Sequence, residues 1–486
     1  MKKKQVKLNR WILAAVLGVP ATLPAWADDA ADIAALKAQI QELDQKVRIL
    51  ERNRELDQES ATNTAKTQPQ ITVGANGFSF VNFSGTSDTN FAVGIHGVLQ
   101  MDTRTFGNDD HIPGSSGLLL RRARPILSGT VYRNFDFLFV PDFGNAAPGN
   151  TSATPTPTIY DALINYRYSP ALQFQAGKFK APVGLEQLQA DANIAFNERS
   201  LVTDLVPNRD LGIELHGDLK GGLLSYAAGV FNGVGDARNT SNYSFQDNRE
   251  FDGRLFAQPF KNLGQPALKN LGVGLAGSWG SSSVTNTLGL PNTTGGSLAG
   301  YATDGQQQFF AYNPLSGQVV AAHTHWRLSP QAAYYHGPFD LLGEYAISDQ
   351  GVANGVHSAA LENTAWEISG GWVLTGEDAS FNGVIPKHPF DPRQGNWGAF
   401  QVIARYAELN IDRAAFPYFS NPATSASGAQ SWAVGLNWYL NQNIRADASF
   451  SHTTFSGGGP SSATSAPGSV SSHPEDVFFT RLQLAF

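Results

Sequence analysis

The 486-residue sequence contains no cysteine, so disulfide bonds and thiolate chemistry contribute nothing to its fold or function. After the first 27 residues, no segment approaches the roughly 18 consecutive apolar residues of a transmembrane helix, which excludes such a helix there. Charge is also sparse. Only 15% of the residues are charged, and 41 acidic residues outnumber 34 Lys and Arg. A net negative chain lacks the electrostatic profile of a nucleic-acid-binding protein.

Glycine and aromatic residues are abundant instead, with 49 Gly and 11% aromatics, a composition typical of many short strands joined by turns. The final segment, 476–486, alternates most clearly. Phe478, Leu482, Leu484 and Phe486 share one face, and Arg481 lies on the opposite face. This pattern predicts the last strand of an outer-membrane β-barrel, with an ordinary sandwich strand as the alternative. We expect the four apolar residues to form the signal for the barrel assembly machinery.

Residues 1–27 have the three parts of a secretory signal peptide. Five basic residues come first, an apolar segment follows at 11–19, and Ala25-Trp26-Ala27 is a small-x-small cleavage site. The sequence therefore predicts cleavage before Asp28 and a mature protein outside the cytoplasm, with an uncleaved anchor as the alternative. Removal of this segment leaves 29 basic and 41 acidic residues, a formal charge of −12.

Residues 28–57 carry a heptad repeat without Pro or Gly. Six apolar residues recur at spacings of 3 and 4, with charged and polar residues between them: Ile33, Leu36, Ile40, Leu43, Val47 and Leu50. We predict an α-helix whose apolar seam forms a coiled coil; docking of the seam on a folded domain is the alternative. Residues 58–90 are predicted to be a linker.

Residues 91–486 predict an all-β fold, a 16-stranded antiparallel transmembrane β-barrel. The expected strands are 91–106, 118–131, 134–142, 158–168, 171–180, 210–218, 223–231, 251–259, 270–280, 327–335, 338–346, 364–374, 398–408, 432–440, 443–452 and 476–486. Short turns alternate with longer loops, as in membrane barrels. Residues 281–326 fit an outer loop, whereas 375–397 are too long for the short turn expected there. In strand 158–168, Tyr160 is assigned to the apolar outer face and Asp161 to the lumen.

Five segments of this region resemble the phosphate-selective porin (O/P-type) family. They are Gly97-Val-Leu-Gln-Met-Asp102, Leu120-Arg-Arg-Ala-Arg-Pro-Ile-Leu-Ser-Gly-Thr-Val-Tyr132, Gly177-Lys-Phe-Lys-Ala-Pro-Val-Gly-Leu-Glu186, Leu374-Thr-Gly-Glu377 and Val434-Gly-Leu-Asn-Trp-Tyr439. The resemblance covers about residues 91–486. It implies homotrimers of 16-stranded barrels in contact with outer-membrane lipid, a third loop (181–209 here) folded into the lumen, and basic side chains that lead small anions to the constriction.

Nine basic residues are candidates for lining the pore or binding anions. They are Arg121, Arg122, Arg124, Arg167, Lys178, Lys180, Arg254, Arg405 and Arg445. Guanidinium groups bind phosphate and carboxylate oxygens bidentately. The alternative is that the arginines are ordinary wall residues paired with acids such as Asp161 and Asp447. Consecutive strand residues point to opposite faces, so Arg121 and Arg122 require a bulge, or one of them faces a subunit interface.

Three positions depart from the family pattern, because selective members carry basic residues where this chain has Val98, Gln187 and Asp136. The loop 181–209 contains four acidic residues and only two arginines. We therefore predict an outer-membrane porin for small hydrophilic solutes, in which an anion or phosphate preference is a weaker expectation. The alternative function is structural, with a coiled coil that tethers or spaces the membrane. No catalytic, metal-binding or cofactor motif stands out, so neither an enzyme nor a cofactor is predicted.

Overall fold

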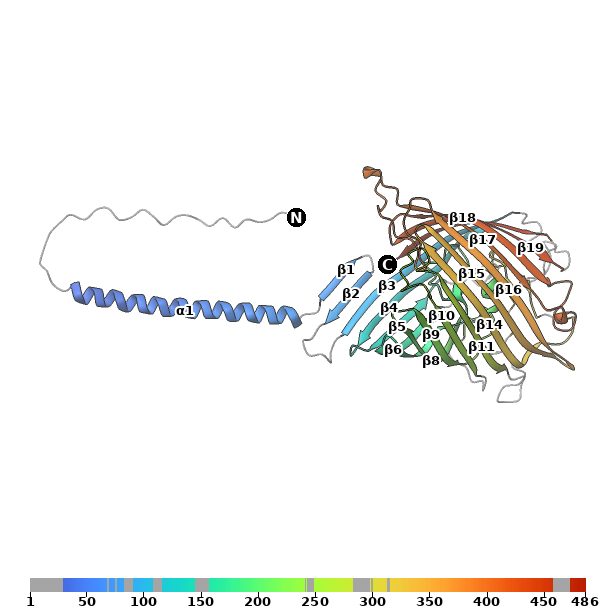
Figure 1. Cartoon of the computed structure of the whole chain (residues 1–486), viewed down its shortest axis with the longest axis horizontal. Helices are drawn as coiled ribbons and strands as arrows, with labels where there is room; N and C mark the ends of the chain where they lie inside the picture. Colours follow the sequence, from blue (N-terminus) through green and yellow to red (C-terminus); the bar gives the residue numbers. More distant parts are fainter. Residues whose placement is uncertain are drawn as a thin grey trace. The chain divides into compact units, whose positions relative to one another are not determined.

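The alternating region forms a closed antiparallel barrel in the computed structural model (Figure 1). Within the described residues, sixteen strands make the wall, each paired with the next along the chain. The ring closes where β20 (Glu475–Ala485) pairs with β3 (Phe91–Gly107). The structure describes residues 29–67, 70–74, 77–82, 91–107, 116–144, 157–240, 242, 249–282, 298, 300–312, 315–457 and 473–486. The predicted signal peptide, 1–27, lies outside these residues.

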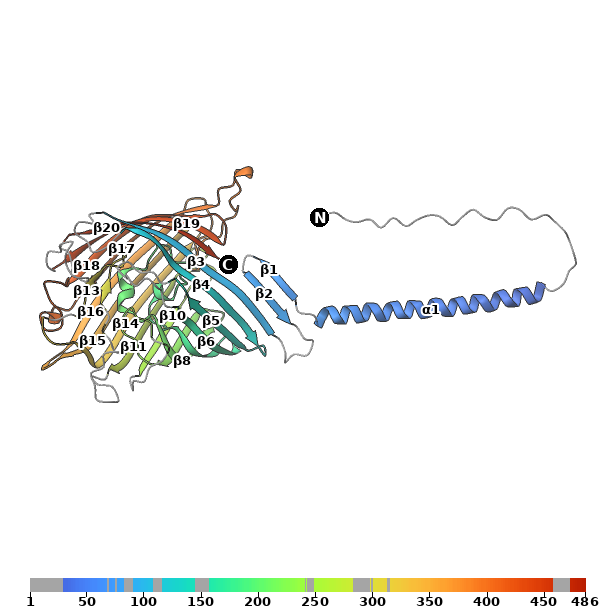
Figure 2. The same cartoon turned by 180° about the vertical axis from the view of Figure 1, so that it is seen from behind.

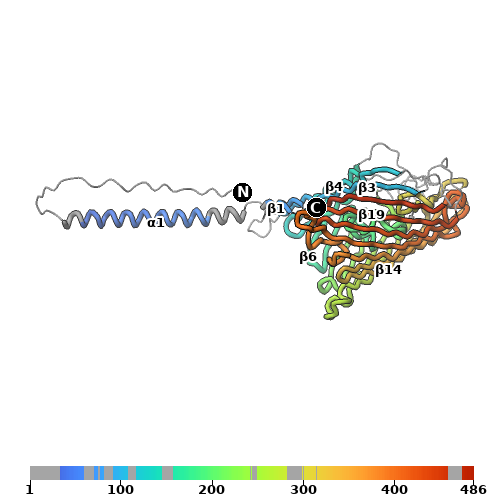
Figure 3. Tube along the Cα trace, turned by 90° about the horizontal axis from the view of Figure 1, so that it is seen from above, coloured from blue at the N-terminus to red at the C-terminus, as the bar shows by residue number. Residues whose placement is uncertain are grey.

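The other wall strands follow in chain order. They are β4 (Gly117–Val131), β5 (Phe135–Asp142), β6 (Thr158–Ser169), β7 (Leu172–Lys180), β8 (Arg209–Leu219), β9 (Leu224–Phe231), β10 (Glu250–Ala257), β11 (Gly272–Ser282), β14 (Val320–His336), β15 (Phe339–Asn354), β16 (His357–Val373), β17 (Ala399–Asn410), β18 (Gly428–Tyr439) and β19 (Ile444–Ser456). Figure 3 follows β14 and β19 as long traces through the wall. Strands β14 to β16 are longer than predicted. Backbone pairing between strands continues beyond the bilayer, where the outer face need not be apolar and the alternation is lost.

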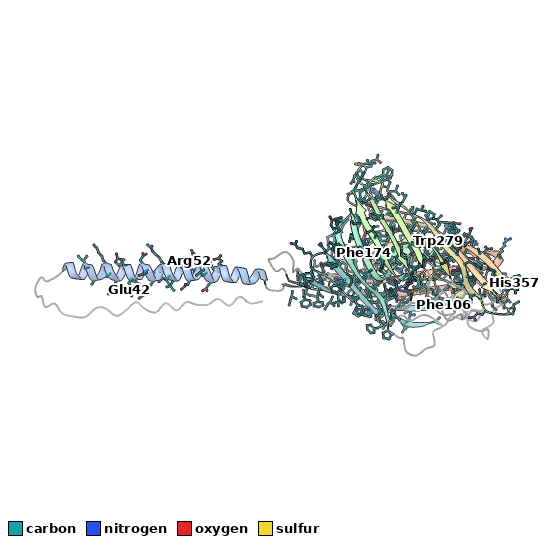
Figure 4. The ribbon with its side chains drawn as sticks, turned by 90° about the horizontal axis from the view of Figure 1, so that it is seen from below. Glu42, Arg52, Phe106, Phe174, Trp279 and His357 are labelled. Atoms are coloured by element: carbon teal, nitrogen blue, oxygen red, sulfur yellow. The ribbon has the colours of Figure 1, made fainter. Side chains whose placement is uncertain are left out.

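The two faces of the wall differ as the alternation predicts. Phe174 and Trp279, labelled in Figure 4, are outward residues with exposed fractions of 46% and 56%. Inward residues are polar yet buried, among them Gln100 and Ser329. An apolar exterior with a polar interior is the arrangement of a barrel that spans lipid around a wet lumen.

The C-terminal strand completes the wall through its last residue. The Phe486 amide donates to the Gly97 carbonyl oxygen at 3.0 Å, and the Gly97 amide donates to the Phe486 carbonyl oxygen at 2.9 Å. Phe478, Leu482 and Leu484 are exposed on the outer face. The terminal segment therefore belongs to the closing seam of the barrel.

The N-terminal unit is a single helix, α1 (Asp29–Thr67). The six apolar residues of the heptad seam are all exposed, with fractions from 47% to 66%. Salt bridges on the polar faces follow the i, i+4 or i, i+3 spacing, as between Glu42 and Lys46 at 2.7 Å. The helix continues ten residues beyond the predicted end at 57, because the next helix-breaking residue is Pro69. None of the described helices combines the length and apolar content that crossing a membrane requires.

The predicted linker also contains a β-hairpin, which is a correction to the sequence analysis. Strand β1 (Gln70–Gly74) pairs with β2 (Gly77–Asn82), and β2 pairs with the start of β3 (Figure 2). Ile71 lies opposite Phe80, and Val73 lies opposite Phe78, so the apolar residues share one face. The alternating signal is only five or six residues long on each strand, too short to distinguish a hairpin from a linker in the sequence.

Four connections contain further short elements. The loop 181–208 between β7 and β8, here called the inner loop, contains α2 (Leu185–Leu188) and the 3₁₀ helix η1 (Leu201–Leu205). The connection between β11 and β14 contains a hairpin of β12 (Tyr301–Ala302) and β13 (Gln308–Phe310). The link between β16 and β17 contains η2 (Pro392–Gln394), and η3 (Arg413–Ala415) follows β17. We call the end of the barrel with the short turns and Phe486 the turn end, and the opposite end the loop end.

The β12–β13 hairpin corrects the expectation that 281–326 is entirely an outer loop. Tyr301, Phe309 and Phe310 are buried in the largest apolar cluster, together with Leu201 and Leu205 of the inner loop. The Ala302 amide donates to the Asp204 carboxylate at 3.0 Å. The aromatic residues of this hairpin are therefore buried inside the barrel, where they pack against the inner loop and the wall.

Candidate functional site

The inner loop crosses the lumen and is held by much of the wall. Its segment, coloured green, lies within the barrel outline in Figures 1 and 2. Side chains that bond it come from the strands β3, β4, β7, β14, β15, β17, β18, β19 and β20. Among the described residues, none of its hydrogen bonds goes to β5, β6, β9, β10 or β11. The loop therefore enters the lumen between β7 and β8 and is hydrogen-bonded mainly to the wall from β14 round to β4, while Leu185 packs with Phe256 of β10.

Glu198 is the principal anchor of the inner loop. Its carboxylate accepts hydrogen bonds from Arg121 at 2.6 and 3.0 Å and from Arg104 at 2.7 Å. Arg122 and Arg481 lie 3.8 Å away. Burial alone would raise the pKa of Glu198, but the arginines outweigh it and hold the pKa well below its usual value. The carboxylate is therefore ionised at neutral pH.

A β-bulge brings both arginines of the consecutive pair to this anchor. In the β3–β4 ladder Gln100 lies opposite Arg122 and Met101 lies opposite Leu120, so Arg121 is an extra residue. Arg121 reaches Glu198, and Arg122 donates to the Gln100 side chain at 2.7 Å. The bulge supplies the geometry that the alternation alone did not allow.

Asp191 is a second anchor, close to the first. Its carboxylate accepts from Arg199 at 2.5 Å and from Arg124. Arg124 also donates to Asp142 of β5 at 2.6 Å. Burial would raise the pKa of Asp191, but Arg199, with the neighbouring arginines, lowers it well below the usual value. Two acids of the inner loop are thus neutralised by wall and loop arginines.

Arg405 and Glu344 hold the remaining side of the loop. Arg405 donates to Glu186 at 3.2 Å and to Asp304, beside the β12–β13 hairpin, at 2.9 Å. Glu344 of β15 accepts from the backbone amides of Leu185 and Glu186 at 2.9 and 3.0 Å. These two amides are free donors at the start of α2, and the carboxylate satisfies them.

The geometry is that of a wide barrel whose lumen is crossed by a loop fixed on wall arginines. The family model described as phosphate-selective porin O and P matches residues 93–486. The chain belongs to the phosphate-selective porin O and P family. This family and fold are those of a channel of the bacterial outer membrane rather than of an enzyme.

One solved structure of an outer-membrane channel shares the fold of this porin, and further solved outer-membrane proteins resemble it at lower scores. The outer membrane channel DcaP of Acinetobacter baumannii gives a TM-score of 0.51 at 8% identity, covering 82% of this chain and 97% of that one. An anion-selective porin from Comamonas acidovorans gives 0.49 at 11% identity, with 82% and 100% covered. OmpT of Vibrio cholerae gives 0.46 at 9% identity, with 82% and 98% covered. The comparison with curated proteins finds no match.

Two of the nine predicted basic residues in this porin, both at the end of β7, have no carboxylate partner within salt-bridge distance among the described residues. Lys180 donates to the Gln189 carbonyl oxygen at 2.7 Å, and Lys178 donates to the Asn242 side chain at 3.2 Å. Two others pair elsewhere on the wall: Arg167 with Asp136 at 2.5 Å and Arg445 with Asp447 at 2.8 Å. The last, Arg254, donates to the Gln331 side chain at 3.0 Å and has no ion pair among the described residues.

The three positions that depart from the family pattern are also placed. Asp136 is the partner of Arg167, and Gln187 is buried in the inner loop, where it donates to the Asn208 side chain. Val98 lies in β3 between Ala485 and Arg124. Asp136 is therefore an acid paired on the wall, and Gln187 is a neutral residue whose side chain is hydrogen-bonded within the inner loop.

Sequence reasoning missed several residues of the site. Arg104 is 1% exposed and belongs to the Glu198 anchor, and its phase with Gln100 and Asp102 along β3 was the signal that could have identified it. Tyr160 was assigned outward and is inward. A bulge opposite Val140 makes it an extra residue of β6. Its ring lies between the guanidinium groups of Arg124 and Arg209, each 3.6 Å from the ring centroid.

Proposed function

We propose that this porin conducts small hydrophilic solutes with a weak preference for anions, and that it is not a dedicated phosphate channel. The observation that carries this proposal is the pairing of wall arginines with the acids of the inner loop. Arg104, Arg121 and Arg124 each make a close ion pair with Glu198, Asp191 or Asp142. A filter that concentrates phosphate needs unneutralised positive charge at the narrow point.

The route for solutes in this proposal runs along the β5–β11 side of the lumen. The inner loop makes no hydrogen bond to β5, β6 or β9–β11 in the part of the chain that the structure describes. Side chains facing that region include Asn165, Gln175 and Glu214, which suit a hydrated path. A barrel of about sixteen strands is wide enough to hold both a folded loop and water.

A reversal-potential measurement tests the proposal. Purified full-length protein in a planar bilayer, with a KCl gradient across it, should show discrete open levels and a modest chloride preference. Half-blocking of the chloride current by micromolar phosphate would refute the weak-selectivity reading. Absence of any open level would favour the structural alternative, in which the barrel serves mainly as an anchor.

We also propose that α1 associates with α1 of other copies and supports a homotrimer. The support is the exposed apolar seam on an otherwise polar helix, because such a seam is stabilised by burial against a similar seam. Cross-linking of full-length protein in membranes should trap trimers through residue pairs on the seam. Recovery of monomers alone, with no cross-linked trimer, would contradict the proposal. A periplasmic tether remains a second role for the same helix.

A further inference from the structure

Arg254 differs from the other arginines of the inner wall. Within the described residues, the inward arginines of the other strands have carboxylate partners within 4 Å: Arg104, Arg121, Arg122, Arg124, Arg167, Arg209, Arg327, Arg405, Arg445 and Arg481. Arg254 uses only Nε, which donates to the neutral Gln331 side chain. Glu344 and Glu214 act on its charge from beyond ion-pair distance, and among the described residues no hydrogen bond or ion pair engages its two terminal nitrogens, so these can donate to a ligand.

A cavity of about 340 Å³ lies beside Arg254 on the β8–β11 side of the lumen. Its lining includes Phe256, Tyr335 and Phe381 from three different elements, so one side is aromatic. The Arg254 guanidinium stands over the Phe256 ring, 4.6 Å from the centroid. Lys261, also in the lining, donates to the Gly222 carbonyl oxygen at 3.3 Å and has no ion pair among the described residues.

The link between β16 and β17 shapes this cavity. Phe381 belongs to that link, and its carbonyl oxygen accepts from the Gln189 side chain of the inner loop at 2.8 Å. Phe381 also packs in a cluster with Leu185 of the inner loop and with Tyr335. The unusually long turn-end connection thus supplies an aromatic wall that is fixed by the constricting loop.

The lining decides the chemistry of the ligand. A fork of two guanidinium donors matches a carboxylate, and three aromatic rings match an apolar or aromatic body. Oxygens of inorganic phosphate turned toward Phe256, Phe381 or Leu185 would lack a donor, and the polar part of the lining includes Asp218, whose negative charge disfavours a dianion more than a monoanion. The volume falls within the range of small-molecule sites, which is roughly 300–1,000 Å³.

We propose that this cavity is a binding subsite for organic monocarboxylates with an apolar or aromatic body, with Arg254 as the carboxylate-binding residue. The inference rests on the proposed porin function, since the solute reaches the cavity through the lumen. Binding is weak enough for release, as conduction requires. The subsite gives the channel a preference by shape and polarity rather than by net charge.

The test uses full-length protein in planar bilayers, with benzoate, acetate and phosphate as probes at pH 7. Benzoate should reduce the open-channel chloride current at concentrations where acetate and phosphate have little effect. Arg254→Gln should weaken the benzoate effect by about tenfold or more, since a charge-assisted carboxylate pair is lost. Phe381→Ala should reduce the discrimination between benzoate and acetate.

The matched control is Arg393→Gln, which removes the same charge from the exposed turn-end segment η2. This control should leave the benzoate effect unchanged. Equal effects of the three probes on the unmodified channel would overturn the inference without any variant. Equal effects of the Arg254 and Arg393 changes would also overturn it, because only the general field would then matter. In both cases chloride conduction would persist, so the proposed porin function would stand.

Discussion

The anchor at Glu198 gives the sharpest prediction for selectivity. Glu198→Gln removes one negative charge that Arg104 and Arg121 contact within 3.0 Å and that Arg122 faces at 3.8 Å. An anion that passes about 4 Å from the uncovered charge gains ~1 kcal/mol even at the dielectric constant of water. That energy corresponds to a rise of about fivefold in the chloride-to-potassium permeability ratio. A lower local dielectric constant would increase the effect.

The assay is the reversal potential in a tenfold KCl gradient, with mean salt near 0.1 M and again near 1 M. The increase should shrink at high salt, because the screening length falls from about 10 to about 3 Å. Glu362→Gln, a change at an exposed position of β16, is the matched control and should leave the ratio unaltered. An unchanged ratio for Glu198→Gln, with normal open-level current, would refute the electrostatic argument. A larger current with lower selectivity would instead show that the loop had detached, since breaking a buried pair costs ~3–5 kcal/mol.

Three further predictions follow from other parts of the molecule. Deletion of Phe486 should reduce outer-membrane levels, because Gly97 loses both backbone partners at the seam; normal surface abundance on blots would contradict this. Deletion of residues 28–57 should leave single-channel conductance intact and lower the temperature at which unboiled oligomers dissociate on gels; a truncated protein that inserts without conducting would contradict the division of roles. Burial raises the pKa of Asp204 well above its usual value although the hydrogen bond from the Ala302 amide favours the ionised form, so packing of the β12–β13 hairpin against the inner loop should weaken as rising pH ionises the buried acid. Asp204→Asn should abolish that pH dependence in hydrogen exchange of residues 301–310, and an unchanged pH profile would contradict it.

The barrel could be predicted because its physical demands repeat along the chain. Lipid outside and water inside require alternation in every strand, so strand number and most boundaries are visible in the sequence. The requirement for alternating apolar and polar residues ends where the bilayer ends. This explains why β14–β16 extend beyond their predicted limits. The same requirement does not apply along the β1–β2 hairpin. Its apolar residues Ile71 and Val73 alternate over too few positions to distinguish the hairpin from a linker.

The site could be predicted only as a set of side chains on one face, because charge compensation joins residues far apart in sequence. Alternation placed Arg405 inward, but nothing local connects it with Glu186 or Asp304. For the same reason, the acidic inner loop and the basic wall were weighed as separate contributions to selectivity. In the folded porin they neutralise each other, so the anion preference that we propose must come from cations that remain unpaired. The consecutive pair Arg121–Arg122 holds the loop, and the candidate for anion recognition is Arg254, which no sequence motif distinguishes.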